Sequence, residues 1–159
     1  MTDSLPTEVT VLTDVNVLAI ALTDDHPVHD DVYPWIQEAI DGPNALLVFD
    51  YYPLRAQYLM TSNFGVDTAA ARNAIQSLVR SPARIITATE TTLLEAYEIS
   101  AEKNHDVYDS FILALARAYD ADYLITTDSD FDDLCEDEDV NYLNPIPAAK
   151  REKLTLIDG

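Results

Sequence analysis

The sequence lacks residues on which several classes of protein depend. Its 159 residues include a single cysteine, Cys135, and only three glycines. One cysteine forms no internal disulfide and no cysteine-rich metal site. Three glycines leave no glycine-rich loop to cradle phosphate. No apolar run is long enough to span a membrane, and no basic start precedes an apolar stretch. We therefore expect a cytoplasmic protein with neither a membrane segment nor a secretory signal.

Basic residues are scarce as well. Nine Lys+Arg stand against 29 Asp+Glu, and the formal net charge is −20. Such a charge keeps a protein soluble, but it repels the protein's own parts and any polyanion. At about 1 M salt the Debye length is only about 3 Å, which would screen this repulsion. We therefore expect a halophilic source and acids that are mostly solvated.

The apolar residues are arranged as short runs that alternate with helical patterns. They make up 48% of the chain, enough for one domain with a sizeable core. The patterns predict strands at 9–13, 45–49, 84–88, 122–126 and 139–143, and helices at 15–22, 29–41, 53–61, 67–79, 90–103, 107–119 and 130–135. This alternation predicts an α/β fold with a mainly parallel sheet covered on both faces. We expect a leader at 1–8, a single domain at 9–146 and a polar tail at 147–159.

Side-chain orientation follows from the same patterns. In the helix at 90–103 we expect Leu93, Leu94 and Tyr97 to face the core, with Ala101 as a further candidate. The three histidines are far apart in turn-like sequence, so we expect them on the surface.

Acidic residues follow two of the predicted strands. The first strand ends at Asp14, and the strand at 122–126 is followed by Asp128 and Asp130. Asp109 lies in an otherwise apolar helix, where an unpaired carboxylate is costly. Ligands of parallel α/β folds bind beyond the carboxyl ends of the strands, so these acids are expected to converge. Carboxylates suit Mg²⁺ or Mn²⁺, and such a site is typical of phosphodiester hydrolysis.

Helix capping is the alternative interpretation of these acids. Asp14 can cap the helix that begins at Val15, and Asp128 or Asp130 can cap the turn that follows them. Asp106 can cap the helix at 107–119, which leaves Asp109 in a first turn where the helix dipole favours it. None of these roles requires a metal.

Three segments resemble, in order and spacing, the motifs of the PIN domain. They are Asp14-Val-Asn16-Val-Leu, Asp109-x-x-Ile-Leu-Ala-Leu-Ala-Arg, and Leu124-Ile-Thr-Thr-Asp128-Ser-Asp130-Phe. The resemblance covers residues 9–146 and implies an α/β/α sandwich that binds Mg²⁺ or Mn²⁺ and cuts RNA. A chain of this size looks most like a VapC-type toxin, a ribonuclease that is usually a homodimer and is silenced by a small antitoxin.

The resemblance also implies roles for individual residues. It implies that Asp14, Asp109 and Asp128 are the catalytic metal ligands, and that Asn16, Thr126 and Asp130 support the site. One departure concerns the helix after the second strand, where the family has a glutamate and this chain has no acid. The expected position holds Gln57 or Leu54. Asp50 is a candidate substitute from the helix start, and Gln57 is a candidate to hold a metal-bound water.

Two other functions stay open on the sequence. Without the helix glutamate, the chain can be a PIN-fold binding module with little or no catalysis. Another α/β hydrolase or phosphatase could use the same acids, although Asn16 breaks the Asp-x-Asp pair common in phosphatases. For RNA binding, Arg55, Arg72, Arg80 and Arg84 are candidates for a basic patch, but the sequence does not place them together.

Overall fold

The computed structural model describes residues 4–151, which fold around one sheet of five strands. The strands are β1 (Thr10–Thr13), β2 (Ala45–Phe49), β3 (Arg84–Ile86), β4 (Tyr123–Ile125) and β5 (Asn141–Leu143). Their order in the sheet is β3-β2-β1-β4-β5, and every neighbouring pair is parallel. The predicted mainly parallel sheet is therefore confirmed, and β1 and β4 lie side by side at its centre.

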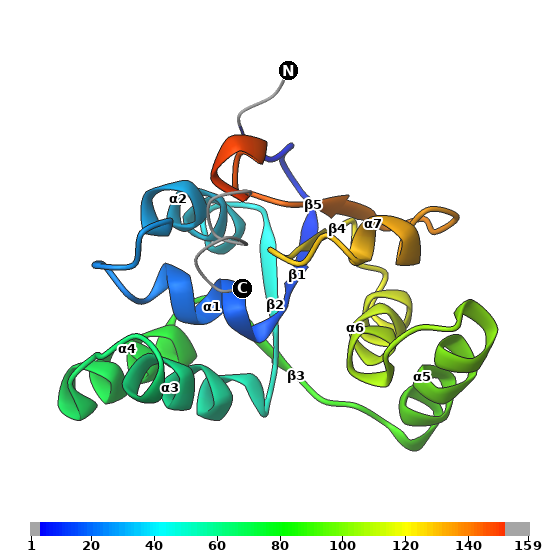
Figure 1. Cartoon of the computed structure of the whole chain (residues 1–159), viewed down its shortest axis with the longest axis horizontal. Coiled ribbons are helices and arrows are strands. Elements are labelled where there is room, and N and C mark those ends of the chain that lie inside the picture. The colour runs from blue at the N-terminus through cyan, green and yellow to red at the C-terminus, as the bar shows by residue number, and fades with distance from the viewer. Residues whose placement is uncertain (1–3, 152–159) are drawn as a thin grey trace.

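Helices cover both faces of the sheet and make it the middle of three layers (Figure 1). They are α1 (Val15–Ala21), α2 (His29–Ile40), α3 (Tyr52–Ser62), α4 (Thr68–Arg80), α5 (Glu90–Lys103), α6 (Val107–Ala118) and α7 (Phe131–Leu134). Helices α1 to α4 pack on one face, and α5 to α7 pack on the other. The predicted α/β/α sandwich is confirmed.

Alternation along the buried strands divides the core between the two faces. Val11 belongs to the core beneath α1 to α4, and its neighbour Leu12 belongs to the core beneath α5 to α7. Leu46 and Leu47 divide in the same way. Successive side chains of a strand point to opposite faces, so strands covered on both sides must be apolar at every position. This explains why the strands read as short apolar runs.

Helix α5 packs with a different face from the predicted one. Leu93, Leu94 and Tyr97 are exposed, at 48%, 57% and 64%. The residues that α5 buries are Thr92, Ala96 and Ile99, and Ala101 is exposed too. Both sets have helical spacing, so the sequence pattern could not distinguish them. Helix α5 packs against α6, and the face that it buries leaves Leu93, Leu94 and Tyr97 in solvent.

The segments that flank the predicted domain are in part attached to it. In the predicted leader, Leu5 is buried and its N–H donates to Glu38 Oε2 at 3.3 Å. In the predicted tail, Lys150 forms a 2.7 Å ion pair with Asp31 of α2. The remainder of these two segments, residues 1–3 and 152–159, lies outside the described residues.

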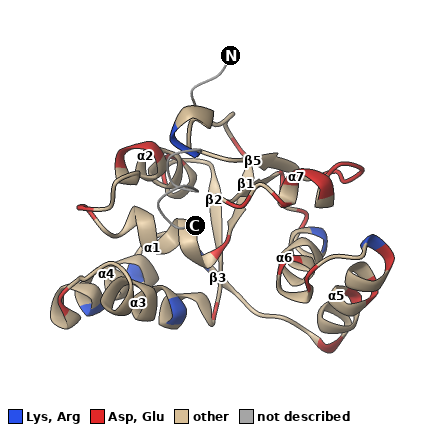
Figure 2. Cartoon of the chain, in the orientation of Figure 1, with Lys and Arg blue, Asp and Glu red and all other residues tan. Residues whose placement is uncertain are grey.

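Charge is unevenly distributed over the elements (Figure 2). Acidic residues occur in helices α2, α5, α6 and α7, whereas α1, α3 and α4 contain none. Asp67, the cap of α4, is the single acid of residues 51–85, which carry four arginines. Among the described helices, none is long and apolar enough to cross a membrane.

Candidate metal centre

Two neighbouring strands bring polar side chains to the carboxyl edge of the sheet. Thr13 of β1 lies opposite Ile125 of β4, so Asp14 and Thr126 follow their strands at the same level. The buried Thr126 hydroxyl donates to Asp14 Oδ2 at 2.5 Å. The Asp128 N–H donates in turn to Thr126 Oγ1 at 3.1 Å. Thr126 therefore joins the two strand-end acids through hydrogen bonds that require no metal.

Three carboxylates come together beside this connection. One oxygen each from Asp109, Asp128 and Asp130 lies within 4.8 Å of the others. Asp109 reaches the group from the first turn of α6, and the other two come from the segment after β4. Asp128 also accepts a 2.9 Å hydrogen bond from the Asp130 N–H, which holds the turn between them. An all-oxygen donor set of this kind fits Mg²⁺ or Mn²⁺.

The electrostatics of the acids favour a cation at this edge. Burial raises the pKa of Asp14 to about 6, hydrogen bonds from Thr126 and Val17 oppose the rise, and the charge of Asp128 adds to it. Burial raises the pKa of Asp109 to about 6 as well, with further contributions from Asp128 and other nearby acids. Each carboxylate is therefore costly to ionise beside its neighbours, and a divalent cation would offset that cost.

Asp14 is held differently from the three clustered acids. It is 6% exposed, and its Oδ1 accepts the Val17 N–H at 2.9 Å as the cap of α1. Its other oxygen accepts the Thr126 hydroxyl. The capping interpretation is therefore confirmed for Asp14. A carboxylate oxygen has two lone pairs, so the cap leaves capacity for a metal.

The other capping predictions have mixed outcomes. Asp106 caps α6 by accepting the N–H groups of Tyr108 and Asp109, at 2.8 and 3.2 Å. Asp130 precedes α7 but makes no side-chain capping bond there. Its carboxylate lies in the cluster instead, so it has a closer place in the candidate site than the sequence suggested.

Helix α3 presents a residue that the sequence interpretation missed. Tyr52 is half-buried, and its burial, together with the charges of Asp14 and Asp109, raises the pKa of its phenol above the usual range. A phenol in this environment keeps its proton and can donate a hydrogen bond. Tyr52, Ala56 and Met60 are four residues apart, and this spacing marks the inward face of α3.

The residues considered for the missing helix acid are not joined to the candidate site by hydrogen bonds. Leu54 and Gln57, at the expected position, are 65% exposed and half-buried, and Asp50, the candidate substitute, is exposed. Within residues 4–151, none of the three forms a hydrogen bond or ion pair with Asp14, Asp109 or Asp128. Asn16 is exposed on the first turn of α1.

His105 is a second residue near the acids that the sequence interpretation did not place there. It is half-buried, and its Nδ1 lies 3.8 Å from Asp109 Oδ2. His26 and His29 are half-buried too. The i, i+4 spacing of His105 and Asp109 across the start of α6 is the signal that could have indicated their contact.

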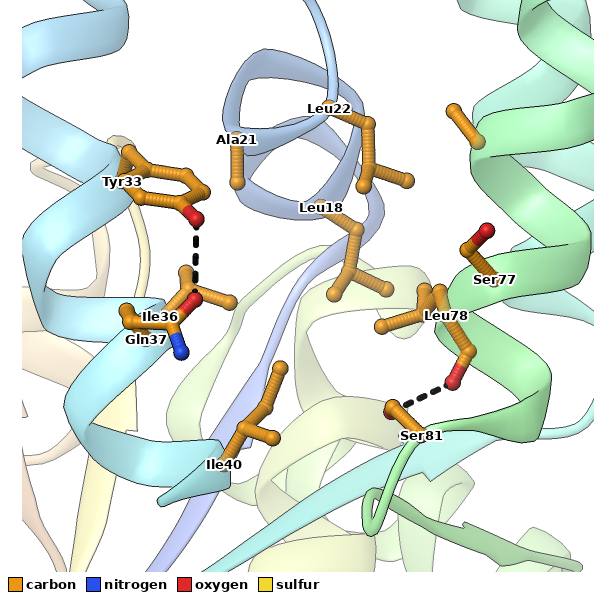
Figure 3. A pocket seen from close by; sticks show the side chains of 11 residues that line it. Leu18, Ala21, Leu22, Tyr33, Ile36, Gln37, Ile40, Ser77, Leu78 and Ser81 are labelled. Carbon is orange, nitrogen blue, oxygen red and sulfur yellow. Dashed lines mark hydrogen bonds between the residues drawn. The ribbon is translucent and has the colours of Figure 1, made fainter.

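A groove lies between α1, α2 and α4, in the helical layer on the other side of the sheet from α5 and α6 (Figure 3). Its volume is about 220 Å³. Its lining is mainly apolar and includes Leu18 and Leu22 of α1, Ile36 and Ile40 of α2, and Leu78 of α4. At the rim, the Tyr33 hydroxyl donates to Gln37 and the Ser81 hydroxyl donates to the Leu78 carbonyl.

Comparisons with known proteins agree with this fold. The family model of the PIN domain matches residues 11–137. The crystal structure of Mycobacterium tuberculosis VapC20, described as a Sarcin-Ricin loop cleaving toxin, has a TM-score of 0.60 at 16% identity and covers 76% of this chain and 92% of its own. The structure of VapBC2 from Rickettsia felis, bound to a DNA fragment from their promoter, has a TM-score of 0.63 at 16% identity, with coverages of 85% and 98%. A search of curated proteins found no match.

Proposed function

The chain belongs to the PIN domain family, and from this premise we propose that it is a metal-dependent endoribonuclease, the VapC-type toxin of a type II toxin–antitoxin pair. The observation that carries the proposal is the group of carboxylates from Asp109, Asp128 and Asp130 beside Asp14, at the carboxyl edge of a parallel sheet. Ligands of open α/β sheets bind at this edge. The substrate class we propose is RNA.

The proposed ligands of Mg²⁺ or Mn²⁺ are Asp14, Asp109 and Asp128, with Asp130 close enough to contribute. A bound metal would supply an activated water and offset charge on the departing oxygen. The protein's own groups set the geometry. Thr126 orients Asp14 and the backbone of Asp128, while Asp106 fixes the turn of α6 that carries Asp109.

An assay of RNA cleavage tests the proposal. Purified protein in molar KCl with Mn²⁺ should cut RNA, and Asp109→Asn should abolish the activity because it removes a charged ligand. Asp137→Asn is a matched control, since Asp137 is an exposed acid outside the cluster. An unchanged rate in Asp109→Asn would reject the site, and a folded wild-type protein that cuts no RNA would reject the function.

The inactive binding module is a second candidate, favoured by one observation. Helix α3 contains no acid where the family has a glutamate, and it brings the phenol of Tyr52 within electrostatic reach of Asp14 and Asp109 instead. Calorimetry with Mn²⁺ separates the two candidates. A nuclease should bind the metal in a manner that depends on Asp14, whereas absence of binding supports the module.

The proposed homodimer has a candidate surface on α3 and α5. These helices expose apolar side chains that a soluble monomer would ordinarily bury: Leu54, Tyr58, Leu93, Leu94 and Tyr97. Replacing Leu94 and Tyr97 by Glu should convert a dimer to monomers, measured by light scattering. Because both side chains are exposed in the single chain, the change should leave the monomer folded. A wild-type protein that is monomeric at micromolar concentration would reject the dimer.

For the antitoxin we propose the groove between α1, α2 and α4. Its apolar lining fits a short amphipathic segment, and it lies on the layer away from α5 and α6. Ser77→Trp, on the groove wall, should block co-purification with a co-expressed antitoxin and leave RNA cleavage unchanged. Retained co-purification would exclude the groove as the docking site.

A further inference from the structure

The α3–α4 hairpin (residues 52–80) differs in charge from the rest of the molecule. The hairpin contains three arginines and one acid, Asp67, a formal charge of +2, while the rest of the chain contains 28 acids and six Lys+Arg. Figure 2 shows the contrast, because blue segments occur on α3 and α4 in a region with almost no red. In a chain of net charge −20, this hairpin is the part that a polyanion can approach.

The arginines of the hairpin are available for such a partner. Arg55, Arg72 and Arg80 are exposed and form no ion pair within residues 4–151. Arg55 stacks on the Tyr58 ring, with its guanidinium carbon 5.4 Å from the ring centroid. Three other cations of the described residues are paired with acids: Arg117 and Lys103 with Glu138, and Lys150 with Asp31. Free positive charge is therefore concentrated on α3 and α4.

The spacing of these residues forms a continuous polar stripe. Arg72, Gln76 and Arg80 are four residues apart and all exposed, so they line one side of α4 over about 12 Å. Helix α4 packs against α3, which places Arg55 on the neighbouring helix. The side chains of the stripe itself are all polar, and three apolar side chains are exposed beside it, Val79 on α4 and Leu54 and Tyr58 on α3. A polar, positive surface is typical of nucleic-acid interfaces, and the core of a protein interface is more apolar.

The hairpin is also connected to the acidic edge. Tyr52 begins α3 within electrostatic reach of Asp14 and Asp109, and Arg55 follows one helical turn later. A strand of RNA that crosses the carboxylates can therefore continue over α3 and α4.

We propose that the α3–α4 hairpin holds the phosphate backbone of the RNA substrate through Arg55, Arg72 and Arg80, next to the candidate metal centre. This inference deepens the proposed function and rests on it for the identity of the polyanion. The acids of the sheet edge would act on the scissile phosphate with metal, and the arginines would hold the flanking phosphates without metal.

Binding of a labelled single-stranded RNA, followed by fluorescence anisotropy in EDTA, tests the inference without cleavage. The measurement is repeated between 0.1 and 1 M KCl, with circular dichroism to confirm folding at each salt concentration. For the double variant Arg72→Ala/Arg80→Ala, we expect the slope of log K against log[KCl] to become shallower by about 1.4, since each contact with a single-strand phosphate contributes roughly 0.7. At the lowest salt concentration the affinity should fall at least about tenfold.

A matched control changes the net charge equally on the other layer. Thr91→Glu/Ala118→Glu also lowers the net charge by two, at exposed positions of α5 and α6. It should leave the salt slope as in the wild type, because only local phosphate contacts release counterions.

Several outcomes would overturn the inference. An equal slope in the arginine double variant would do so, and so would a wild-type protein that binds no RNA at any salt concentration. A double variant that binds RNA normally but no longer assembles with a co-expressed antitoxin would assign the arginines to an acidic protein. If the wild type cuts RNA and the arginine double variant keeps the wild-type salt slope, the proposed function stands and the RNA-binding role of the hairpin is rejected. If binding depends on the arginines but no RNA is cut, the surface stands and the catalytic proposal fails.

Discussion

The carboxyl edge of the sheet and the neighbouring α3–α4 hairpin differ in the sign and in the burial of their charged residues. At the edge, four acids are buried or crowded, and burial raises the pKa of Asp14 and of Asp109 to about 6. On the hairpin, three arginines are solvated, and exposed charges of this kind cost little. Crowded carboxylates reduce the stability of the metal-free protein, and the proposed cation would offset this cost. On the two proposals together, chemistry and RNA binding would belong to separate surfaces.

The largest effect is expected from Asp128→Asn. Loss of this carboxylate should lower kcat/KM for RNA by at least about 100-fold, because metal-based charge stabilisation is worth several kcal/mol. RNA binding in EDTA should stay equal to the wild type or become tighter, since the change removes a like charge. Cleavage and anisotropy measurements on the same preparation check both. A comparable loss of metal-free binding would abolish the distinction between the two surfaces.

The second prediction concerns the loss of folding stability caused by ionising Asp14 at the acidic edge. Asp14 is a buried acid whose pKa is raised from 3.8 to about 6 in the folded state. Its stabilising contribution is therefore complete below about pH 4 and is lost as the pH rises through about 6. The difference corresponds to roughly 3 kcal/mol at pH 7, at about 1.4 kcal/mol per unit.

Asp14→Asn should remove much of this pH dependence. Asparagine can keep the cap of α1, so the metal-free variant should be more stable than the wild type at pH 7 and similar at pH 4. Urea unfolding in EDTA at both pH values measures the effect. Asp137→Asn, at an exposed position, should follow the wild type. If the free energy of unfolding changes equally between pH 4 and pH 7 in Asp14→Asn and in the wild type, ionisation of Asp14 does not destabilise the folded protein.

A smaller effect is expected from Tyr52→Phe, at the junction of the two regions. The change keeps the ring, which packs edge-to-face on Phe49 at a centroid distance of 5.3 Å, and removes a hydroxyl within electrostatic reach of Asp14 and Asp109. Stability should change by less than about 1.5 kcal/mol, because the hydroxyl can supply at most one donated hydrogen bond. Affinity for Mn²⁺, measured by calorimetry, should change by less than about tenfold. A loss as large as that of Asp128→Asn would make Tyr52 a full member of the metal site.

The smallest effect is expected from Arg72→Lys/Arg80→Lys on the hairpin. A side chain that only neutralises a backbone phosphate needs positive charge and does not read a base. Because lysine keeps the charge, the RNA affinity should change by less than about twofold. Anisotropy titrations at a single salt concentration suffice. A large loss would indicate that the arginines make geometrically specific contacts, as a bidentate pair does.

Local signals in the sequence predicted the order of the elements and the acids that follow the strands. Apolar runs of strand formers marked all five strands, and Asp67, Asp106 and Asp14 marked helix starts that the structure confirms. These predictions succeeded because strand runs and caps depend on residues adjacent in the chain. The roles of Asp14, Asp109 and Asp128 as metal ligands remain predictions.

Predictions that depended on which helical face finds a neighbour were less successful. Near α3, helical spacing groups Leu54 and Gln57 with Asp50, yet the inward face of the helix is that of Tyr52, Ala56 and Met60. In α5, the buried face is that of Thr92, Ala96 and Ile99, and the larger apolar side chains Leu93, Leu94 and Tyr97 are exposed. Helical periodicity groups residues on a face, but it does not identify the face that is covered.

The sequence by itself determined the parallel α/β pattern, the acids at the ends of β1 and β4, and the acid-poor segment at 51–85. The tertiary structure alone decided that β1 and β4 are neighbours, that Asp130 joins Asp109 and Asp128, and that Tyr52 faces the acids. Strand ends and caps are written in short-range sequence, whereas proximity and burial arise from contacts between residues distant in the chain. Thr126 and Asp14, hydrogen-bonded across 112 positions, show the difference most directly.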